Sequence, residues 1–176
     1  MKMLKTVLAL TAACLGATGG MAALAIGAKA PDFTTRGALA GKPFTLTLKH
    51  QLRHGPVVLY FFPKAFTPGC SAEAREFADH IADFKKAGAT VIGMSADPVD
   101  DLISFSTKEC AGKFPVASAG PAIISGYDVA LKMKPGLTDR TSYVIAPSGR
   151  IAFVHSEMNY AGHVKSTLAA VEAMKR

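Results

Sequence analysis

The sequence of 176 residues contains no tryptophan, only three cysteines and only 19% charged residues. It has no Cys-x-x-Cys pair and no glycine-rich phosphate-binding loop, and we expect neither a cofactor nor a metal. Although the formal net charge is +7, lysine and arginine never cluster beyond pairs such as Lys85-Lys86. Because nucleic-acid binding needs a basic stripe or patch, we expect no nucleic-acid partner.

Hydrophobic residues make up 49% of the chain, and its 16 glycines and 10 prolines are scattered. This composition excludes collagen-like, coiled-coil and disordered chains. A chain of this length folds as one compact domain with at most a short appendage. Such a domain buries roughly two-thirds of its unfolded surface, so it needs no metal or disulfide for stability.

The first 23 residues have the features of a leader. Lys2 and Lys5 precede an uncharged segment, residues 6–28, which has an apolar core and then small residues. We therefore expect a cleaved secretory signal at residues 1–23 and a folded domain at residues 24–176. The alternatives are an uncleaved membrane anchor and a lipoprotein acylated on Cys14. All three place the domain outside the cytoplasm, and we expect a periplasmic protein that contacts the membrane only through this leader.

Two cysteines, Cys70 and Cys110, remain in the folded domain, because Cys14 lies in the leader. By cysteine counting alone, two cysteines in an oxidising compartment indicate one structural disulfide. The residues around Cys70 favour a chemical role instead.

Hydrophobic patterning predicts an α/β fold with a central mixed β-sheet flanked by helices on both faces. The expected strands are residues 44–48, 57–62, 89–95, 114–117, 142–145 and 151–154. The expected helices begin at Pro68, at Asp97-Pro98, at Ile123 and after the final strand. Asp97 is expected to cap the second of these helices, which ends near Glu109.

The segment from Pro63 to Cys70 lies between a buried strand and a helix. In the first turn of a helix, unpaired N–H groups and the helix dipole favour a negatively charged sulfur. A thiolate alone gains only a few-fold in rate, because nucleophilicity falls together with basicity. The site therefore needs donors for a transition state, and the candidates are the hydroxyl of Thr67 and the guanidinium of Arg140. Pro63 has no N–H and is suited to excluding water.

The segment Pro63-Lys64-Ala65-Phe66-Thr67-Pro68-Gly69-Cys70, followed by Glu73, resembles the peroxiredoxin signature Pro-x-x-x-Thr-x-x-Cys. The Thr-Pro-Gly-Cys form resembles the branch of the bacterioferritin comigratory protein, or peroxiredoxin Q. The similarity covers about residues 24–176 and includes Arg140 in the Arg-x-x-Tyr-Val-Ile start of the hairpin. The resemblance implies a thioredoxin-like fold, a peroxide substrate (hydrogen peroxide or an organic hydroperoxide) and a thioredoxin-like or other dithiol reductant.

The resemblance also implies a role for each site residue. Cys70 is the peroxidatic nucleophile and becomes a sulfenic acid. Thr67 hydrogen-bonds the thiol or the peroxide, and Arg140 orients the peroxide and stabilises charge on its oxygens. Pro63 shields the sulfenic acid, and Glu73 orients Arg140 or a neighbouring arginine.

The sequence departs from this branch five residues after Cys70, where many members carry a resolving cysteine and this chain has Arg75. Cys110 is the remaining resolving candidate. A Cys70–Cys110 disulfide would require local unfolding, because the two Cα atoms must come within about 7 Å. The alternatives are a bystander Cys110, with Cys70 resolved by an external thiol, and an intermolecular disulfide between two chains. We expect a monomer or a homodimer.

Other functions explain fewer of these residues. A thioredoxin-type disulfide exchanger needs a cysteine where Glu73 stands. A Cys–His hydrolase needs a histidine near Cys70 and explains neither Thr67 nor Arg140. The main alternative is an exported, non-enzymatic redox sensor or binding protein that uses a Cys70–Cys110 disulfide as a switch.

Two further groups have simple interpretations. His50 and His54 have the i, i+4 spacing of metal ligands, but no third ligand is evident, so we expect a solvated loop. Phe66, Met133 and Leu137 form either an apolar collar that favours organic hydroperoxides or ordinary loop packing.

Overall fold

The computed structural model describes residues 23–175, which form seven strands and five helices. In chain order these are β1 (Thr34–Leu39), β2 (Lys42–Thr47), α1 (Leu48–Leu52), β3 (Val57–Phe61), α2 (Pro68–Lys86), β4 (Thr90–Ser95), α3 (Val99–Lys108), β5 (Val116–Ser118), α4 (Pro121–Gly126), β6 (Thr141–Ile145), β7 (Ile151–Ser156) and α5 (His163–Ala173). The expected leader, with Cys14, lies outside the described residues except for residue 23. In the described range, no helix is both long enough and apolar enough to span a bilayer.

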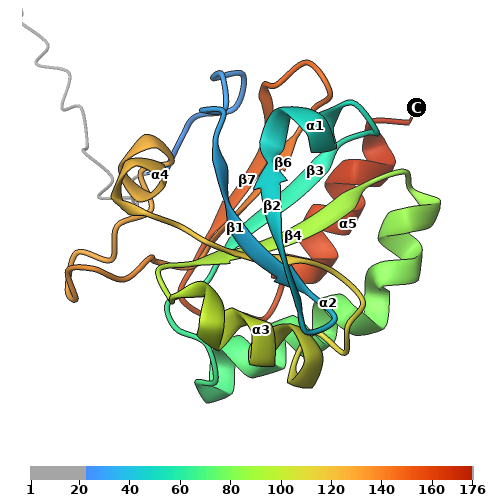
Figure 1. The fold of residues 1–176 in the computed structure, drawn as a ribbon. Helices are drawn as coiled ribbons and strands as arrows, with labels where there is room; N and C mark the ends of the chain where they lie inside the picture. The colour runs from blue at the N-terminus through green and yellow to red at the C-terminus, as the bar shows by residue number, and fades with distance from the viewer. Residues whose placement is uncertain (1–22, 176) are drawn as a thin grey trace, which may run out of the picture.

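The strands form one mixed sheet in the order β2-β1-β5-β4-β3-β6-β7 (Figure 1). The central pairs β3–β4 and β4–β5 are parallel, and the other pairs are antiparallel. Parallel neighbours need a crossover connection, which α2 and α3 provide. The mixed sheet with helices on both faces confirms the expected α/β architecture.

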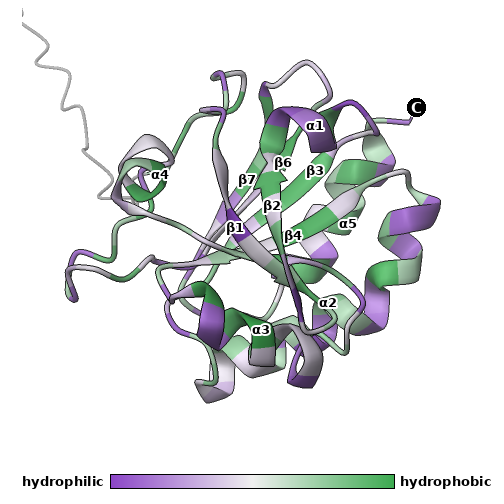
Figure 2. Cartoon of the chain, viewed as in Figure 1, coloured by the Kyte–Doolittle hydropathy of each residue, from purple (hydrophilic) through white to green (hydrophobic). Residues whose placement is uncertain are grey.

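Two apolar clusters fill the two faces of the sheet. Side chains alternate along β3, so Val58 and Tyr60 face a cluster covered by α2, α3 and α5, while Leu59 faces one covered by α1 and α4. In Figure 2 the central strands β3 and β4 are hydrophobic along their length, as expected for strands buried on both faces. This rigid centre fixes the loops that leave its carboxyl edge, where ligands bind in α/β sheets.

Strand β1 was not expected from the sequence. Its residues, TTRGAL, form neither an apolar run nor a regular alternation, yet the strand lies between β2 and β5. A side chain at Gly37 would lie 2.8 Å from the carbonyl oxygen of Val116. Close backbone approach to β5 therefore favours glycine at this position, and no hydrophobic pattern marks the strand in the sequence.

Two expected boundaries were also wrong. Leu48 begins helix α1 instead of ending a strand, and the exposed His50 lies in that helix rather than in a loop. Pro98, not Asp97, occupies the N-cap position of α3, and the helix has no side-chain cap. The Asp97 carboxylate instead accepts a hydrogen bond from the backbone N–H of Ala65, so a tertiary contact has replaced the local one.

Candidate active site

Cys70 lies in the first turn of α2, directly after the loop that leaves β3. Thr67 is the N-cap residue, and Pro68 occupies the first position, where a residue without an N–H loses no helical hydrogen bond. The first helical bond runs from the N–H of Ser71 to the carbonyl of Thr67, at 2.9 Å. The N–H groups of Gly69 and Cys70 precede it, so the positive end of the helix faces the thiol, as expected.

Arg140 brings a buried cation to the sulfur of Cys70. Its Nη2 lies 3.4 Å from Sγ, and the side chain is almost entirely buried. Arg140 immediately precedes β6, and the pairing of Phe61 with Thr141 fixes the start of β6 beside the end of β3. Because the guanidinium remains charged and water is largely excluded, it stabilises a thiolate and any further negative charge that develops beside it.

Two further hydrogen bonds fix the orientation of this guanidinium. Nε donates to the carbonyl oxygen of Met158 at 2.9 Å, and Nη1 donates to the carboxyl group of Glu73. Glu73 lies three residues after Cys70 on α2, so both side chains share one helix face. Nη2 is thereby directed at Cys70, and the side chain is positioned before any substrate arrives.

The hydroxyl of Thr67 points its proton away from the sulfur. It donates to the carbonyl oxygen of Lys64 at 2.9 Å. The Thr67 oxygen therefore keeps its lone pairs for a proton donor, such as a thiol or a peroxide O–H. The partner of this hydroxyl in the structure is Lys64 and not Cys70.

Two buried side chains hold the loop that leaves β3. Asp97 accepts the N–H of Ala65 at 2.7 Å, and the hydroxyl of Thr138 donates to the carbonyl oxygen of Phe62 at 2.7 Å. Pro63 is half-buried between these two anchored residues and adds no N–H group. The loop is therefore fixed by residues that follow β4 and precede β6, far from it in sequence.

A fully buried polar cluster lies behind Arg140. Oε1 of Glu73 has no hydrogen-bond partner among the described residues and lies 3.8 Å from Nδ1 of His163. The same Nδ1 is 2.8 Å from Oγ of Ser142, and Nε2 is 3.0 Å from the carbonyl oxygen of Glu157. Glu73 thus connects the arginine beside Cys70 to the histidine that begins α5.

Burial shifts the pKa values of Glu73 and His163 in opposite directions. It raises the pKa of Glu73 to about 8, although the neighbouring Arg140 acts in the opposite direction. It lowers the pKa of His163 to about 4, although a hydrogen bond to the carbonyl of Glu157 opposes this shift. His163 is therefore neutral at physiological pH.

Cys110 follows the end of α3 and is fully buried. Both Cys110 and Cys70 are free thiols in the structure. Burial raises the pKa of the Cys110 thiol well above its ordinary range, and the charge of Glu109 raises it further. The next two residues, Ala111 and Gly112, have φ angles of 51° and 66°, so the chain turns tightly here. Arg75, on the second turn of α2, forms an ion pair of 2.5 Å with Glu109.

The residues of the expected apolar collar do not share one cavity. Phe66 packs edge-on against Phe105 of α3, with ring centroids 5.3 Å apart. Met133 instead lines an apolar cavity of about 310 Å³ together with Leu131 and Met158. Because Met158 also binds Nε of Arg140 through its carbonyl oxygen, this cavity lies next to the site.

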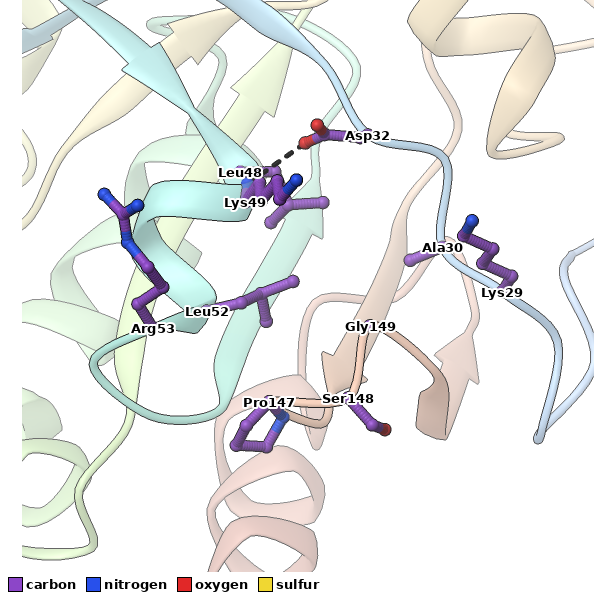
Figure 3. A pocket seen from close by; sticks show the side chains of 10 residues that line it. All are labelled: Lys29, Ala30, Asp32, Leu48, Lys49, Leu52, Arg53, Pro147, Ser148 and Gly149. Atoms are coloured by element: carbon purple, nitrogen blue, oxygen red, sulfur yellow. Dashed lines mark hydrogen bonds between the residues drawn. The ribbon is translucent and has the colours of Figure 1, made fainter.

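A larger cavity, of about 390 Å³, lies at the opposite end of the sheet (Figure 3). Leu48 and Leu52 point into it, and the turn at residues 147–149 lines its other side. That turn follows β6, whereas Arg140 precedes β6, so this cavity is separate from the Cys70 site. Across residues 23–175, no three His, Cys, Asp or Glu side chains are grouped so that they could bind a metal ion.

The structure brings together Cys70, Glu73 and Arg140 and places Thr67 at the N-cap of the same helix, while Pro63 lies in the loop that precedes it. It places Cys110 at the end of another helix. Sequence analysis missed the contacts that support these residues, which come from Asp97, Ser142, Met158 and His163. No spacing or motif could have related His163 to Cys70, because only the packing of α5 brings them to one region.

Comparisons with known proteins point to one family. The family model described as AhpC/TSA family matches residues 26–154. The chain is 33% identical to Peroxiredoxin Bcp of Xanthomonas campestris, over 66% of this chain and 76% of that protein. It is 29% identical to the chloroplastic Peroxiredoxin Q of Sedum lineare, over 85% of this chain and 78% of that protein. The crystal structure of Peroxidoxin BcpB from Mycobacterium tuberculosis superposes with a TM-score of 0.76 at 28% identity, over 86% of this chain and 98% of that chain.

Proposed function

This chain belongs to the AhpC/TSA family and is a thiol-dependent peroxidase, a peroxiredoxin, and we propose that Cys70 is its peroxidatic nucleophile. The observation that carries the proposal is the 3.4 Å separation between Nη2 of Arg140 and Sγ of Cys70 at the start of α2. A fixed cation and a helix N-terminus both favour a sulfur anion, and both remain in place as charge moves onto the peroxide.

In the first step, the Cys70 thiolate attacks one oxygen of hydrogen peroxide or of an organic hydroperoxide. An S–O bond forms as the O–O bond breaks, and the other oxygen leaves as hydroxide or alkoxide and takes up a proton. Arg140 stabilises the negative charge on these oxygens, and the Thr67 oxygen accepts the O–H of the peroxide. The products are a sulfenic acid on Cys70, which Pro63 shields from water, and water or an alcohol.

In the second step, the Cys110 thiol attacks the sulfur of the Cys70 sulfenic acid. An S–S bond forms, the S–O bond breaks and water leaves, and a thioredoxin-like dithiol then reduces the disulfide with two electrons. Because both cysteines are buried at the ends of different helices, the step requires local opening. The tight turn at Ala111 and Gly112 supports opening at the end of α3, since an alanine with positive φ is strained.

The test is rapid oxidation of the fully reduced chain with one equivalent of hydrogen peroxide, followed by thiol blocking and intact-mass measurement. The wild type is expected to lose two hydrogens, and Cys110→Ser is expected to gain one oxygen and to stop turning over. Cys70→Ser should do neither at a comparable rate, and it is the matched control. Oxidation of Cys70→Ser as fast as the wild type would disprove the assignment of the nucleophile.

Turnover separates a peroxidase from a redox sensor. When a thioredoxin-like dithiol is supplied in excess, we expect many equivalents of peroxide to be consumed per chain. Consumption of a single equivalent, followed by a persistent Cys70–Cys110 disulfide, would instead support the sensor function. Unchanged turnover in Cys110→Ser would remove the resolving role and leave an external thiol in its place.

We also propose that residues 1–23 export the protein, which would place its reductant outside the cytoplasm. The basic start and uncharged segment of the sequence support this proposal. The intact mass of the protein from its native cell would be lower by the leader if the leader is cleaved. It would be raised by an acyl group if Cys14 is lipidated, and the unmodified full mass in a cytoplasmic fraction would disprove export.

A further inference from the structure

The hydrogen-bond partners of His163 determine which ring nitrogen carries the proton. The carbonyl oxygen of Glu157, 3.0 Å from Nε2, can only accept, so Nε2 must be the donor. In a neutral ring, Nδ1 then has a lone pair, which accepts the hydroxyl proton of Ser142 at 2.8 Å. The N-terminal position of His163 in α5 disfavours a second proton on the ring.

One carboxyl oxygen of Glu73 faces the lone pair on Nδ1 of His163 and accepts no hydrogen bond from any described residue. Its Oε2 accepts Nη1 of Arg140, but Oε1 has no partner in the described part of the chain and lies 3.8 Å from Nδ1 of His163. A buried carboxylate oxygen that faces a lone pair suffers both desolvation and repulsion. A proton on Oε1 removes the repulsion and supplies a donor, which competes with the Ser142 hydroxyl for the single lone pair of Nδ1. The Oε1–Nδ1 separation exceeds an O–H···N hydrogen bond by about 1 Å, so this contact requires rotation of the carboxyl group about its soft terminal torsion.

We propose that Glu73 is a carboxylic acid in the reduced enzyme, that it keeps its proton and donates a hydrogen bond to Nδ1 of His163, and that His163 is thereby a positioning residue for Arg140. The inference rests on the peroxidase function proposed above. A neutral Glu73 still accepts a hydrogen bond from Nη1, so it orients the guanidinium without neutralising it. The full charge of Arg140 is then directed at the Cys70 sulfur and at the oxygen that leaves.

The surroundings of Glu73 favour this neutral form. The titratable and charged groups around it are Arg140 before β6, Tyr60 in β3, His163 in α5 with His155 of β7 behind it, and Cys70 and Glu76 in α2. Among these, Arg140 carries a permanent positive charge, which the Cys70 thiolate of the proposed mechanism balances. Burial also raises the pKa of Glu73 to about 8, so the acid prevails at pH 7.

Infrared spectroscopy of the full chain in its reduced state tests this protonation directly. At pH 7 we expect a protonated-carboxyl band that is absent from Glu73→Gln. The band should disappear as the pH rises through about 8, with loss of its proton to solvent. A wild-type spectrum at pH 7 without a band that depends on Glu73 would overturn the proposal.

The same titration should appear in the kinetics. The second-order rate constant for hydrogen peroxide should fall about tenfold as Glu73 ionises, the size of a one-unit interaction between coupled groups. In Glu73→Gln, whose side chain is neutral at every pH, the alkaline fall should be absent. A rate constant that falls equally in both proteins would show that another group is responsible and would overturn the link to Arg140.

Substitutions at His163 and at Ser142 are expected to shift the pH midpoint of the infrared band in opposite directions. His163→Leu removes the acceptor and should lower the midpoint, while His163→Asn supplies a side-chain oxygen close to the place of Nδ1 and should restore it. Ser142→Ala removes the competing donor and should raise the midpoint. If His163→Leu does not fold, Ser142→Ala provides the test. An unchanged or lowered midpoint in that variant would disprove the hydrogen bond between Glu73 and His163.

The two proposals fail in different ways. If the wild type shows the Glu73 band but does not turn over peroxide, the protonated Glu73 stands and the peroxidase mechanism at Cys70 is disproved. If it reduces peroxide rapidly but shows no such band, the mechanism stands and the protonated Glu73 is disproved.

Discussion

The two buried cysteines of this domain lie in opposite electrostatic surroundings. Cys70 begins a helix and has the guanidinium of Arg140 3.4 Å from its sulfur. Cys110 follows the end of a helix and lies beside Glu109, whose charge adds to the effect of burial in raising the pKa of that thiol. Their exposures are equally low, 2% and 0%. Burial alone therefore does not distinguish the two thiols, whereas the neighbouring charges do.

Helix direction accounts for part of this difference. The N-terminus of α2 favours a thiolate at Cys70, and the C-terminus of α3 disfavours one at Cys110. A thiol such as Cys110 gains reactivity only when its segment opens to water or to a new partner. In the proposed mechanism, the same fold thus contains one cysteine prepared for reaction and one that must first be released.

The largest expected effect comes from removing the cation beside Cys70. Arg140→Met should lower the second-order rate constant for hydrogen peroxide by about 100- to 1,000-fold, because a preorganised donor to the developing charge is lost. Stopped-flow kinetics would measure this. The double variant Arg140→Met with Glu73→Gln is the control, because it leaves no buried acid without its partner. A rate restored in the double variant would mean that the loss was structural.

Protonation of His163, in the buried polar cluster behind Arg140, should lower the stability of the folded protein in acid. Its pKa is about 4 when folded, against about 6.5 when unfolded, so the unfolded chain binds more protons between these values. Stability that is fully present above pH 6.5 is therefore lost as the pH falls towards 4, by at most about 3 kcal/mol. Urea unfolding of the wild type and of His163→Asn at pH 7 and pH 4.5 would measure it as the difference between the two proteins, because Glu73 offsets the loss in both.

His163→Asn is the control for this acid effect, since it has no titrating ring and should lose less stability between the two pH values. Glu73 contributes with the opposite sign, because its raised pKa favours the folded chain at low pH and that contribution is lost as the pH rises towards 8. An equal acid loss in the wild type and in His163→Asn would assign the effect to other groups.

A smaller effect is expected at Tyr60, whose buried hydroxyl has no hydrogen-bond partner in the described residues. Burial raises its pKa, and charges on both Cys110 and Cys70 would raise it further, so this residue lies near both thiols. Tyr60→Phe should stabilise the protein by about 1 kcal/mol, because it removes an unpaired polar group and keeps the stacking on Phe77. Destabilisation in urea would instead mean that the hydroxyl bonds to one of the thiols.

The smallest effect concerns the ion pair between Arg75 and Glu109, which links α2 to the residue before Cys110. Arg75 is largely exposed, and such pairs contribute at most about 1 kcal/mol. Arg75→Ala should therefore accelerate formation of the Cys70–Cys110 disulfide by no more than about fivefold, as measured by thiol blocking and mass. Arg75→Lys is the matched control, and slower disulfide formation in Arg75→Ala would contradict a restraint on Cys110.

Local patterns predicted the regular parts of the fold. The apolar runs of β3 and β4 and the amphipathic α2 were all expected, and the solved relatives confirm the thioredoxin-like peroxiredoxin fold. β1 was missed because backbone approach at Gly37, not a hydrophobic pattern, suits it to the sheet. Asp97 was assigned to a helix cap because its partner, the N–H of Ala65, is distant in sequence.

The sequence by itself placed the proposed nucleophile, because a cysteine after Thr-Pro-Gly at a strand-to-helix junction is expected in the first helical turn. It also offered Arg140 as a cationic donor before the start of the hairpin, whereas Glu73 was identified only through the family resemblance. The tertiary structure alone decided that Arg140 reaches the sulfur, that Met158 and Glu73 hold it there, and that His163 lies behind Glu73. These contacts join β6, the segment after β7 and α5 to α2, and no local pattern encodes which long-range partners will meet when a sheet and its helices pack.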